Sequence, residues 1–119
     1  MRDELLECGY FSFLDTGSLE KLSSATTLKR YEKGGVIFFG GEVSDFIHIV
    51  YTGAVRIYRA RSDGGEITVG IFRPFSFFGE FANFKNIPFP SNAEALIDSL
   101  VLRIEYRTFR EMFFDDTIR

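Results

Sequence analysis

The chain has 119 residues, a formal net charge of −3, 45% hydrophobic residues and 26% charged residues. This length suits one compact domain that buries roughly two-thirds of the surface its unfolded form exposes. The acidic balance argues against a nucleic-acid-binding surface on this chain, because such surfaces need clustered Lys and Arg. No apolar run approaches the ~20 residues of a membrane span, and the charged N-terminus does not resemble a signal peptide.

Cys8 is the only cysteine, which excludes an internal disulfide and any multi-cysteine metal or iron–sulfur site. A cytoplasmic, reducing setting is therefore expected. We expect Cys8 to be a buried structural thiol, since a redox role would need a resolving partner.

The N-terminal segment predicts helices. Residues 3–7 (DELLE) predict a short helical turn, and an apolar anchor of Phe11, Phe13 and Leu14 follows it. Asp15 is a plausible N-cap of a second helix, which places Leu19, Leu22 and Ala25 on one face. This helix is expected to end between residues 26 and 28, where two threonines weaken the helical preference.

From Leu28 onward the period changes to two, the pattern of half-buried strands. The expected strands are residues 36–39, 46–51, 54–60, 66–71 and 99–104, and Ser62-Asp63-Gly64-Gly65 is the strongest hairpin signal. Strands at intervals of ~8–12 residues with glycine punctuation predict a sandwich or barrel. Phe109, Met112 and Phe113 restore helical spacing, so the predicted order is helix, antiparallel β-roll, helix.

Residues 73–96 (RPFSFFGEFANFKNIPFPSNAEAL) have the composition of a ligand cradle. Gly79 can bring its backbone close to another group because it has no Cβ, and Glu80 beside it can address a bound hydroxyl. The aromatic side chains around them admit two interpretations. They fill the core and the pocket, or some line a pocket for an apolar or aromatic effector with Glu80, Ser91 and Asn92 as polar contacts. These aromatic residues are Phe72, Phe75, Phe77, Phe78, Phe81, Phe84 and Phe89.

Enzymatic chemistry has little support, and we expect no enzyme and no catalytic residues. Metal enzymes built on β-barrels need several converging ligands, whereas His48 is the only histidine. A structural imidazole that faces the core or a partner is favoured over a metal or haem ligand. No serine lies in a GxSxG elbow, and the Asp115-Asp116 pair is expected to be solvated.

The arginines near the hairpin signal do not form a convincing basic stripe. Arg59 and Arg61 share a face of their strand while Arg56 points the other way. A solvated hairpin is therefore favoured over a nucleic-acid site.

Short motifs follow one another along nearly the whole chain: Tyr31-Glu32-Lys33-Gly34 before Val36-Ile37, Gly41-Glu42, Ile47 to Gly53 with Ala54-Val55, Asp63 to Ile67, Phe77 to Glu80, Ala93 to Leu96, Ser99, and the helix containing Phe109. In this order and spacing they resemble a cyclic-nucleotide-binding-type β-roll, and more closely the N-terminal sensor domain of Crp/Fnr-type bacterial transcription regulators. The resemblance implies a mainly β, antiparallel double-stranded β-helix or jelly roll, flanked by short N- and C-terminal helices. Residues 1–119 would form this single domain.

In nucleotide-binding members of that family, the segment equivalent to residues 73–96 holds the ligand with a Gly-Glu pair, an arginine and a small hydroxyl residue. Gly79, Glu80 and Ser91 match three of these positions, but Pro90 stands in the place of the arginine. The loss of a charge-assisted hydrogen bond of roughly 1.5–3 kcal/mol predicts phosphate binding weakened about ten- to a thousandfold. The candidate pocket is therefore Phe78, Gly79, Glu80, Phe81, Ser91 and Asn92, and we expect no tight binding of cyclic AMP.

The segment FPSNAEAL resembles the Fnr-like side of the family, whose members sense oxygen, nitrogen oxides or small metabolites. No cofactor is predicted, because one cysteine cannot hold an iron–sulfur cluster; haem would require His48 or Cys8 as axial ligand. The expected function is a sensor domain for an unidentified small effector, as a homodimer in the full-length protein. The alternatives are a cyclic-nucleotide-binding module of another signalling protein, or a ligand-free interaction domain with a Phe-filled pocket.

The family's regulators continue into a dimerisation helix and a helix-turn-helix domain. Residues 114–119 resemble the first turn of that helix, and DNA would be contacted only through a domain that this chain lacks. An excised sensor half of a longer protein is favoured over a stand-alone domain.

Overall fold

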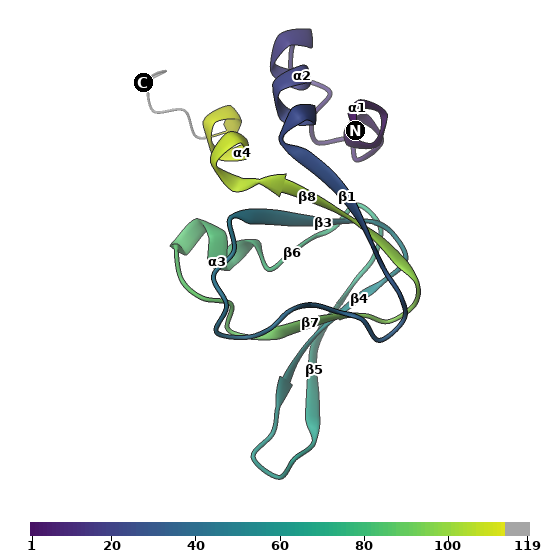
Figure 1. The fold of residues 1–119 in the computed structure, drawn as a ribbon, viewed down its shortest axis with the longest axis vertical. Coiled ribbons are helices and arrows are strands. Elements are labelled where there is room, and N and C mark those ends of the chain that lie inside the picture. Colours follow the sequence, from purple (N-terminus) through teal and green to yellow (C-terminus); the bar gives the residue numbers. More distant parts are fainter. Residues whose placement is uncertain (114–119) are drawn as a thin grey trace.

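Two antiparallel sheets face each other, with the two N-terminal helices and the C-terminal helix at one end of the molecule (Figure 1). A computed structural model of the chain describes residues 1–113. One sheet has the order β1 (Thr26–Tyr31), β8 (Ser99–Glu105), β3 (Phe46–Thr52) and β6 (Phe77–Phe78). The other has the order β2 (Val36–Phe38), β7 (Asn92–Ala95), β4 (Val55–Ala60) and β5 (Glu66–Phe72).

The helices are short and cover the first sheet. They are α1 (Arg2–Glu7), α2 (Thr16–Ser24), α3 (Glu80–Lys85) and α4 (Tyr106–Phe113). Asp15 caps α2, since its side chain accepts a hydrogen bond of 2.7 Å from the Ser18 amide. The helix ends earlier than predicted because Thr26 already pairs with Ile104 as the first residue of β1. None of the helices within residues 1–113 is long and apolar enough to cross a membrane.

Strand alternation divides the apolar side chains into two clusters. On β3, Ile47 and Ile49 point to the helices, whereas Val50 points between the two sheets. The inner cluster, between the sheets, contains Tyr31, Phe38, Val50, Val55, Ile57, Phe78, Ala82, Phe89, Ala93, Ala95 and Val101. The outer cluster, under α1, α2 and α4, contains Leu5, Cys8, Phe11, Leu19, Leu22, Ile47, Ile49, Leu102, Ile104 and Phe109. The predicted mainly β jelly roll with flanking short helices is confirmed.

Three strands are missing from the predicted set: β1, which begins where the second helix was expected to end, and the short strands β6 and β7. β6 has only 2 residues and β7 has 4, so neither is long enough to show an alternation. Residues 114–119, with the Asp115-Asp116 pair and the predicted start of a dimerisation helix, lie outside the described residues.

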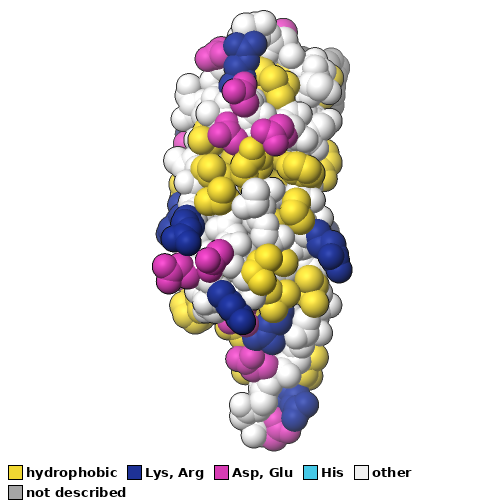
Figure 2. Space-filling view, turned by 90° about the vertical axis from the view of Figure 1, so that its right-hand side faces the viewer, with side chains coloured by type: hydrophobic (Ala, Val, Ile, Leu, Met, Phe, Trp, Pro, Cys, Tyr) yellow, Lys and Arg dark blue, Asp and Glu magenta, His cyan; other side chains and the backbone are white. Residues whose placement is uncertain are grey.

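The β4–β5 hairpin extends away from the rest of the roll (Figure 1). Its turn is fixed by Asp63, which accepts hydrogen bonds from the Gly65 amide at 3.0 Å and from Arg61 at 2.7 Å. The end of the molecule that carries this hairpin bears charged side chains of both signs (Figure 2). This mixed surface agrees with the predicted solvated hairpin.

Candidate functional site

Gly79 lies between β6 and α3, at the base of the predicted cradle. Its φ of +72° is in the left-handed region, and a Cβ there would lie 2.8 Å from Phe38 Cζ and 3.1 Å from Phe89 Cε1. Glycine is required because two ring edges approach its α-carbon. The close approach expected at Gly79 exists, but the groups that approach are side chains of this chain.

Phe89 places its ring inside the roll. The ring stacks on Phe38 with 3.6 Å between centroids and 5° between planes, and both side chains are buried. Two backbone hydrogen bonds hold Phe89 in position: its amide donates to the Glu42 carbonyl at 2.9 Å, and its carbonyl accepts from the Gly41 amide at 2.8 Å. The interior beside Gly79 is therefore filled by an aromatic pair.

His48 borders this pair. It is 2% exposed, and its ring centroid lies 5.5 Å from that of Phe38, 5.4 Å from Phe78 and 6.3 Å from Phe89. Its Nδ1 has no hydrogen-bond partner within the part of the chain that the structure describes. Burial, with the positive charges of Arg103 and Lys29, lowers the pKa of His48 to about 3. The imidazole is thus neutral at physiological pH, and of its two predicted orientations it adopts the one toward the core.

A cation reaches the cradle from a different strand. Arg59, on β4, donates a hydrogen bond of 3.0 Å from Nε to the hydroxyl of Ser91, which is 6% exposed. The neighbouring Asn92 accepts a hydrogen bond of 2.7 Å from the Gly40 amide through Oδ1. Sequence reasoning missed Arg59 because the contact depends on the pairing of β4 with β7, in which Tyr58 lies opposite Asn92. The sequence showed only which face of its strand Arg59 occupies.

The other candidate residues differ in position. Phe78 is fully buried in the inner cluster. Glu80 begins α3 and is half-buried, and its carboxylate forms no hydrogen bond or ion pair with another residue of the described chain. Phe81 lies on the outer side of α3 and is 57% exposed, with Lys85 Nζ 5.8 Å from its ring centroid. The structure therefore places Gly79 against Phe89 and groups Phe78 with Phe89 in the inner cluster, whereas Ser91 is bonded by Arg59 and Phe81 is exposed.

The seven phenylalanines of this region divide into three groups. Phe78 and Phe89 belong to the inner cluster, Phe72 packs against it, and Phe77 packs against the outer cluster. Phe75, Phe81 and Phe84 are exposed. Interior filling therefore accounts for part of the aromatic content only.

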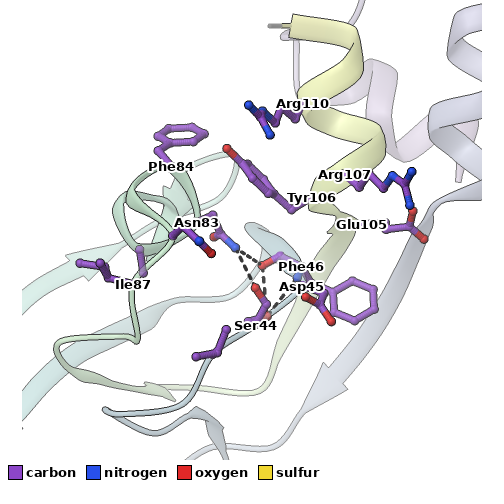
Figure 3. A pocket seen from close by; sticks show the side chains of 13 residues that line it. Ser44, Asp45, Phe46, Asn83, Phe84, Ile87, Glu105, Tyr106, Arg107 and Arg110 are labelled. Carbon is purple, nitrogen blue, oxygen red and sulfur yellow. Dashed lines mark hydrogen bonds between the residues drawn. The ribbon is translucent and has the colours of Figure 1, made fainter. Parts of the chain in front are cut away.

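A separate open cavity of about 820 Å³ lies between α3, α4 and the start of β3 (Figure 3). Its wall includes Phe84 and Tyr106, whose ring centroids are 6.0 Å apart, with Arg110 at the rim (Figure 3). Asn83, which is 8% exposed, donates from Nδ2 to the Ser44 and Phe46 carbonyls, while its Oδ1 has no partner. None of the six candidate residues lines this cavity.

Cys8 and His48 lie on opposite sides of the first sheet. Cys8 is in the outer cluster, where burial and the negative charge of Glu7 raise the pKa of its thiol to about 11. The prediction of a buried thiol is confirmed. Within residues 1–113, no group of three or more His, Cys, Asp or Glu side chains is placed to hold a metal ion.

The family model described as cyclic nucleotide-binding domain matches residues 28–116. The chain is 28% identical over 109 residues to a cAMP-dependent protein kinase regulatory subunit of Blastocladiella emersonii, covering 92% of this chain and 27% of that protein. It is 26% identical over 114 residues to a CRP-like cAMP-activated global transcriptional regulator of Mycobacterium tuberculosis, covering 95% and 51%.

Among solved structures, the sensor domain of the transcriptional regulator DNR from Pseudomonas aeruginosa superposes with a TM-score of 0.84. The sequence identity is 23%, and the superposition covers 98% of this chain and 79% of that chain. At this identity the likeness shows the fold alone. The chain spans about half of the mycobacterial regulator and a smaller share of the kinase subunit.

Proposed function

This chain belongs to the cyclic nucleotide-binding domain family, and we propose that it is an effector-sensing domain of the Crp/Fnr type whose effector is not a cyclic nucleotide. The observation that carries the proposal is the Phe89 ring, stacked 3.6 Å from Phe38 and packed against Gly79. A nucleotide in the cradle would have to displace this buried pair. The effector is a small organic molecule, with no haem and no metal.

The phosphate-binding chemistry supports the same proposal. Pro90 stands where nucleotide-binding relatives are expected to carry an arginine, and proline offers neither a charge nor an amide donor. Arg59 is the only cation bonded to the cradle hydroxyl in the described chain, and it reaches Ser91 through Nε. A phosphate would therefore lose a charge-assisted contact of roughly 1.5–3 kcal/mol.

β6 offers a route from the cradle to α4. Its two residues point to opposite faces of the sheet, so Phe78 lies in the inner cluster and Phe77 packs against the outer cluster. The Phe77 ring centroid lies 5.9 Å from that of Phe109 on α4. An effector that moves Phe89 would change the packing of Phe78 and, through β6, favour one position of α4 over another.

The proposal also covers the longer transcription regulator to which this sensor domain would belong. A homodimer that contacts DNA through a helix-turn-helix domain, acting in the cytoplasm, fits the relation to CRP-like regulators. This chain would supply the sensor and transmit the effector's presence through α4.

The test is isothermal titration of the chain with cyclic AMP and cyclic GMP. We expect no binding in the low-micromolar range, because the cradle lacks its arginine and is filled by Phe89. Low-micromolar affinity for either nucleotide would overturn the proposal. Retention of the fold is checked by circular dichroism on the same sample.

A cyclic-nucleotide-binding module is the second candidate, and the contact between Arg59 and Ser91 favours it. In that case Arg59 would supply the cation that Pro90 cannot. The same titration with Arg59→Gln separates the two candidates. A nucleotide that binds the parent chain and loses affinity at least tenfold in this variant would establish the second function.

A further inference from the structure

The Phe89 side chain occupies its site much as a small ligand would. A flat ring lies parallel to Phe38, beside Gly79 and within contact range of His48. The backbone of Phe89 is held by two hydrogen bonds and lies between Pro88 and Pro90, each of which has a fixed φ. Rotation of the side chain alone would therefore vacate the space of one benzyl group. That space suits a single ring, since apolar cavities of about 150 Å³ accept benzene, and it is too small for a nucleotide.

A polar pair close to Phe89 in the chain favours an anion, because Ser91 follows Phe89 by two residues and is bonded by Arg59. Arg59 uses Nε on Ser91, and neither of its terminal amino groups is bonded to a residue in the described range. The Ser91 hydroxyl accepts this bond, so its own hydrogen is available to donate. A guanidinium and a hydroxyl arranged in this way match a carboxylate.

His48 offers one further polar contact, since its ring centroid lies 6.3 Å from that of Phe89. His48 is buried, and its Nδ1 has no partner among residues 1–113. A neutral imidazole has one nitrogen that donates and one that accepts, so a ligand hydroxyl can pair with either tautomer. A hydroxyl on the ring edge nearest His48 would satisfy this nitrogen.

We propose that the effector is a hydroxybenzoate-type aromatic acid that takes the place of the Phe89 ring on Phe38. Its carboxylate would bind Arg59 and Ser91, and its ring hydroxyl would bond His48. This inference rests on the proposed function, because it assigns the chemistry of the same effector site.

The test compares four probes on the 119-residue chain by titration calorimetry and amide NMR. The probes are 4-hydroxybenzoate, benzoate, the uncharged p-cresol, and the non-planar cyclohexanecarboxylate. We expect 4-hydroxybenzoate to bind with shifts at Gly79 and in the segment around Phe89. Benzoate should bind several-fold more weakly, and the other two at least tenfold more weakly.

Two substitutions separate the polar contacts. Arg59→Gln should weaken 4-hydroxybenzoate at least tenfold and leave p-cresol unchanged. The matched control is Arg61→Gln, on the same hairpin and paired with Asp63, which should change neither probe. His48→Leu should remove the advantage of 4-hydroxybenzoate over benzoate.

The Phe89→Ala variant provides an independent test of the same site. With the benzyl group removed, 4-hydroxybenzoate should bind about tenfold more tightly and still depend on Arg59. Should this variant fail to fold, the four probes on the parent chain decide the question.

Several outcomes would overturn the inference. They are equal binding of 4-hydroxybenzoate and cyclohexanecarboxylate, no effect of Arg59→Gln, NMR shifts confined to the cavity between α3 and α4, or no binding of any probe. None of these outcomes bears on the titration with cyclic AMP. The proposal that the effector is not a cyclic nucleotide would therefore be unaffected by them. Low-micromolar binding of cyclic AMP would instead overturn the proposed function itself.

Discussion

The α-carbon of Gly79 faces the ring of Phe38 so closely that a methyl group on it would lie 2.8 Å from Phe38 Cζ. The same methyl group would lie 3.1 Å from Phe89 Cε1. A position expected to approach a ligand is therefore fixed by the packing of two rings. Substitutions at Gly79 therefore test how tightly these two rings fill the interior.

Gly79→Ala should lower the free energy of unfolding by about 2–5 kcal/mol. About 1–2 kcal/mol comes from an L-residue at positive φ, and overpacking against two rings adds ~1–3 kcal/mol. Gly64→Ala is the matched control, because Gly64 has a φ of +92° but nothing within 4 Å of its would-be Cβ. Urea denaturation of both variants measures the difference. Equal losses of stability would show that the rings of Phe38 and Phe89 move aside to make room for the methyl group.

The chain should lose stability as the pH falls from ~6.5 toward about 3 because of His48. The folded state keeps His48 neutral, whereas an unfolded histidine takes up a proton near pH 6.5. The unfolded state then binds more protons, so stability falls by about 1.4 kcal/mol per pH unit, or about 2 kcal/mol by pH 5. Urea denaturation at pH 7 and pH 5 should show this loss in the parent chain and not in His48→Leu.

The NMR titration of His48 gives a direct check, since it is the only histidine. Its Cε1–H resonance should stay constant between pH 8 and pH 5. An ordinary titration near pH 6.5 would contradict the buried, neutral state.

Arg56→Ala should destabilise the chain by about 2–3 kcal/mol. The Arg56 side chain is 17% exposed; it donates to Glu94 at 2.8 Å and Glu66 at 2.6 Å, and its guanidinium carbon lies 4.2 Å from the ring centroid of Tyr58. Its removal would leave partly buried carboxylates without a partner. Arg61→Ala, which breaks an exposed pair with Asp63, should cost under about 1 kcal/mol. Thermal unfolding of the two variants measures the difference. Equal shifts in Tm would argue that the contacts of Arg56 with Glu66 and Glu94 do not stabilise the chain.

Cys8 should react slowly with disulfide reagents in the folded chain. Burial raises the pKa of its thiol to about 11, so little thiolate is present at pH 8. The reaction with Ellman's reagent should be on the order of a hundredfold slower than in urea-unfolded protein. Similar rates in the two states would mean that the N-terminal helices open readily.

The sequence by itself determined five of the eight strands in residues 1–113, namely β2, β3, β4, β5 and β8, and the hairpin between β4 and β5. Residues of alternating polarity have a period of two, and Asp63-Gly64 accepts the turn that joins β4 to β5. It also placed Gly79 at a close approach. These features depend on neighbours in the chain, which is why local pattern was sufficient; the meaning of Pro90 came instead from the resemblance to nucleotide-binding relatives.

Only the tertiary structure decided what fills the cradle and which cation reaches it. Phe89 stacks on Phe38, and Arg59 bonds Ser91, because β2, β7 and β4 are adjacent in one sheet. Alternation tells which face of a strand a side chain occupies, but not which distant strand lies beside it. Sheet order and register set those contacts, and with them the chemistry available to an effector.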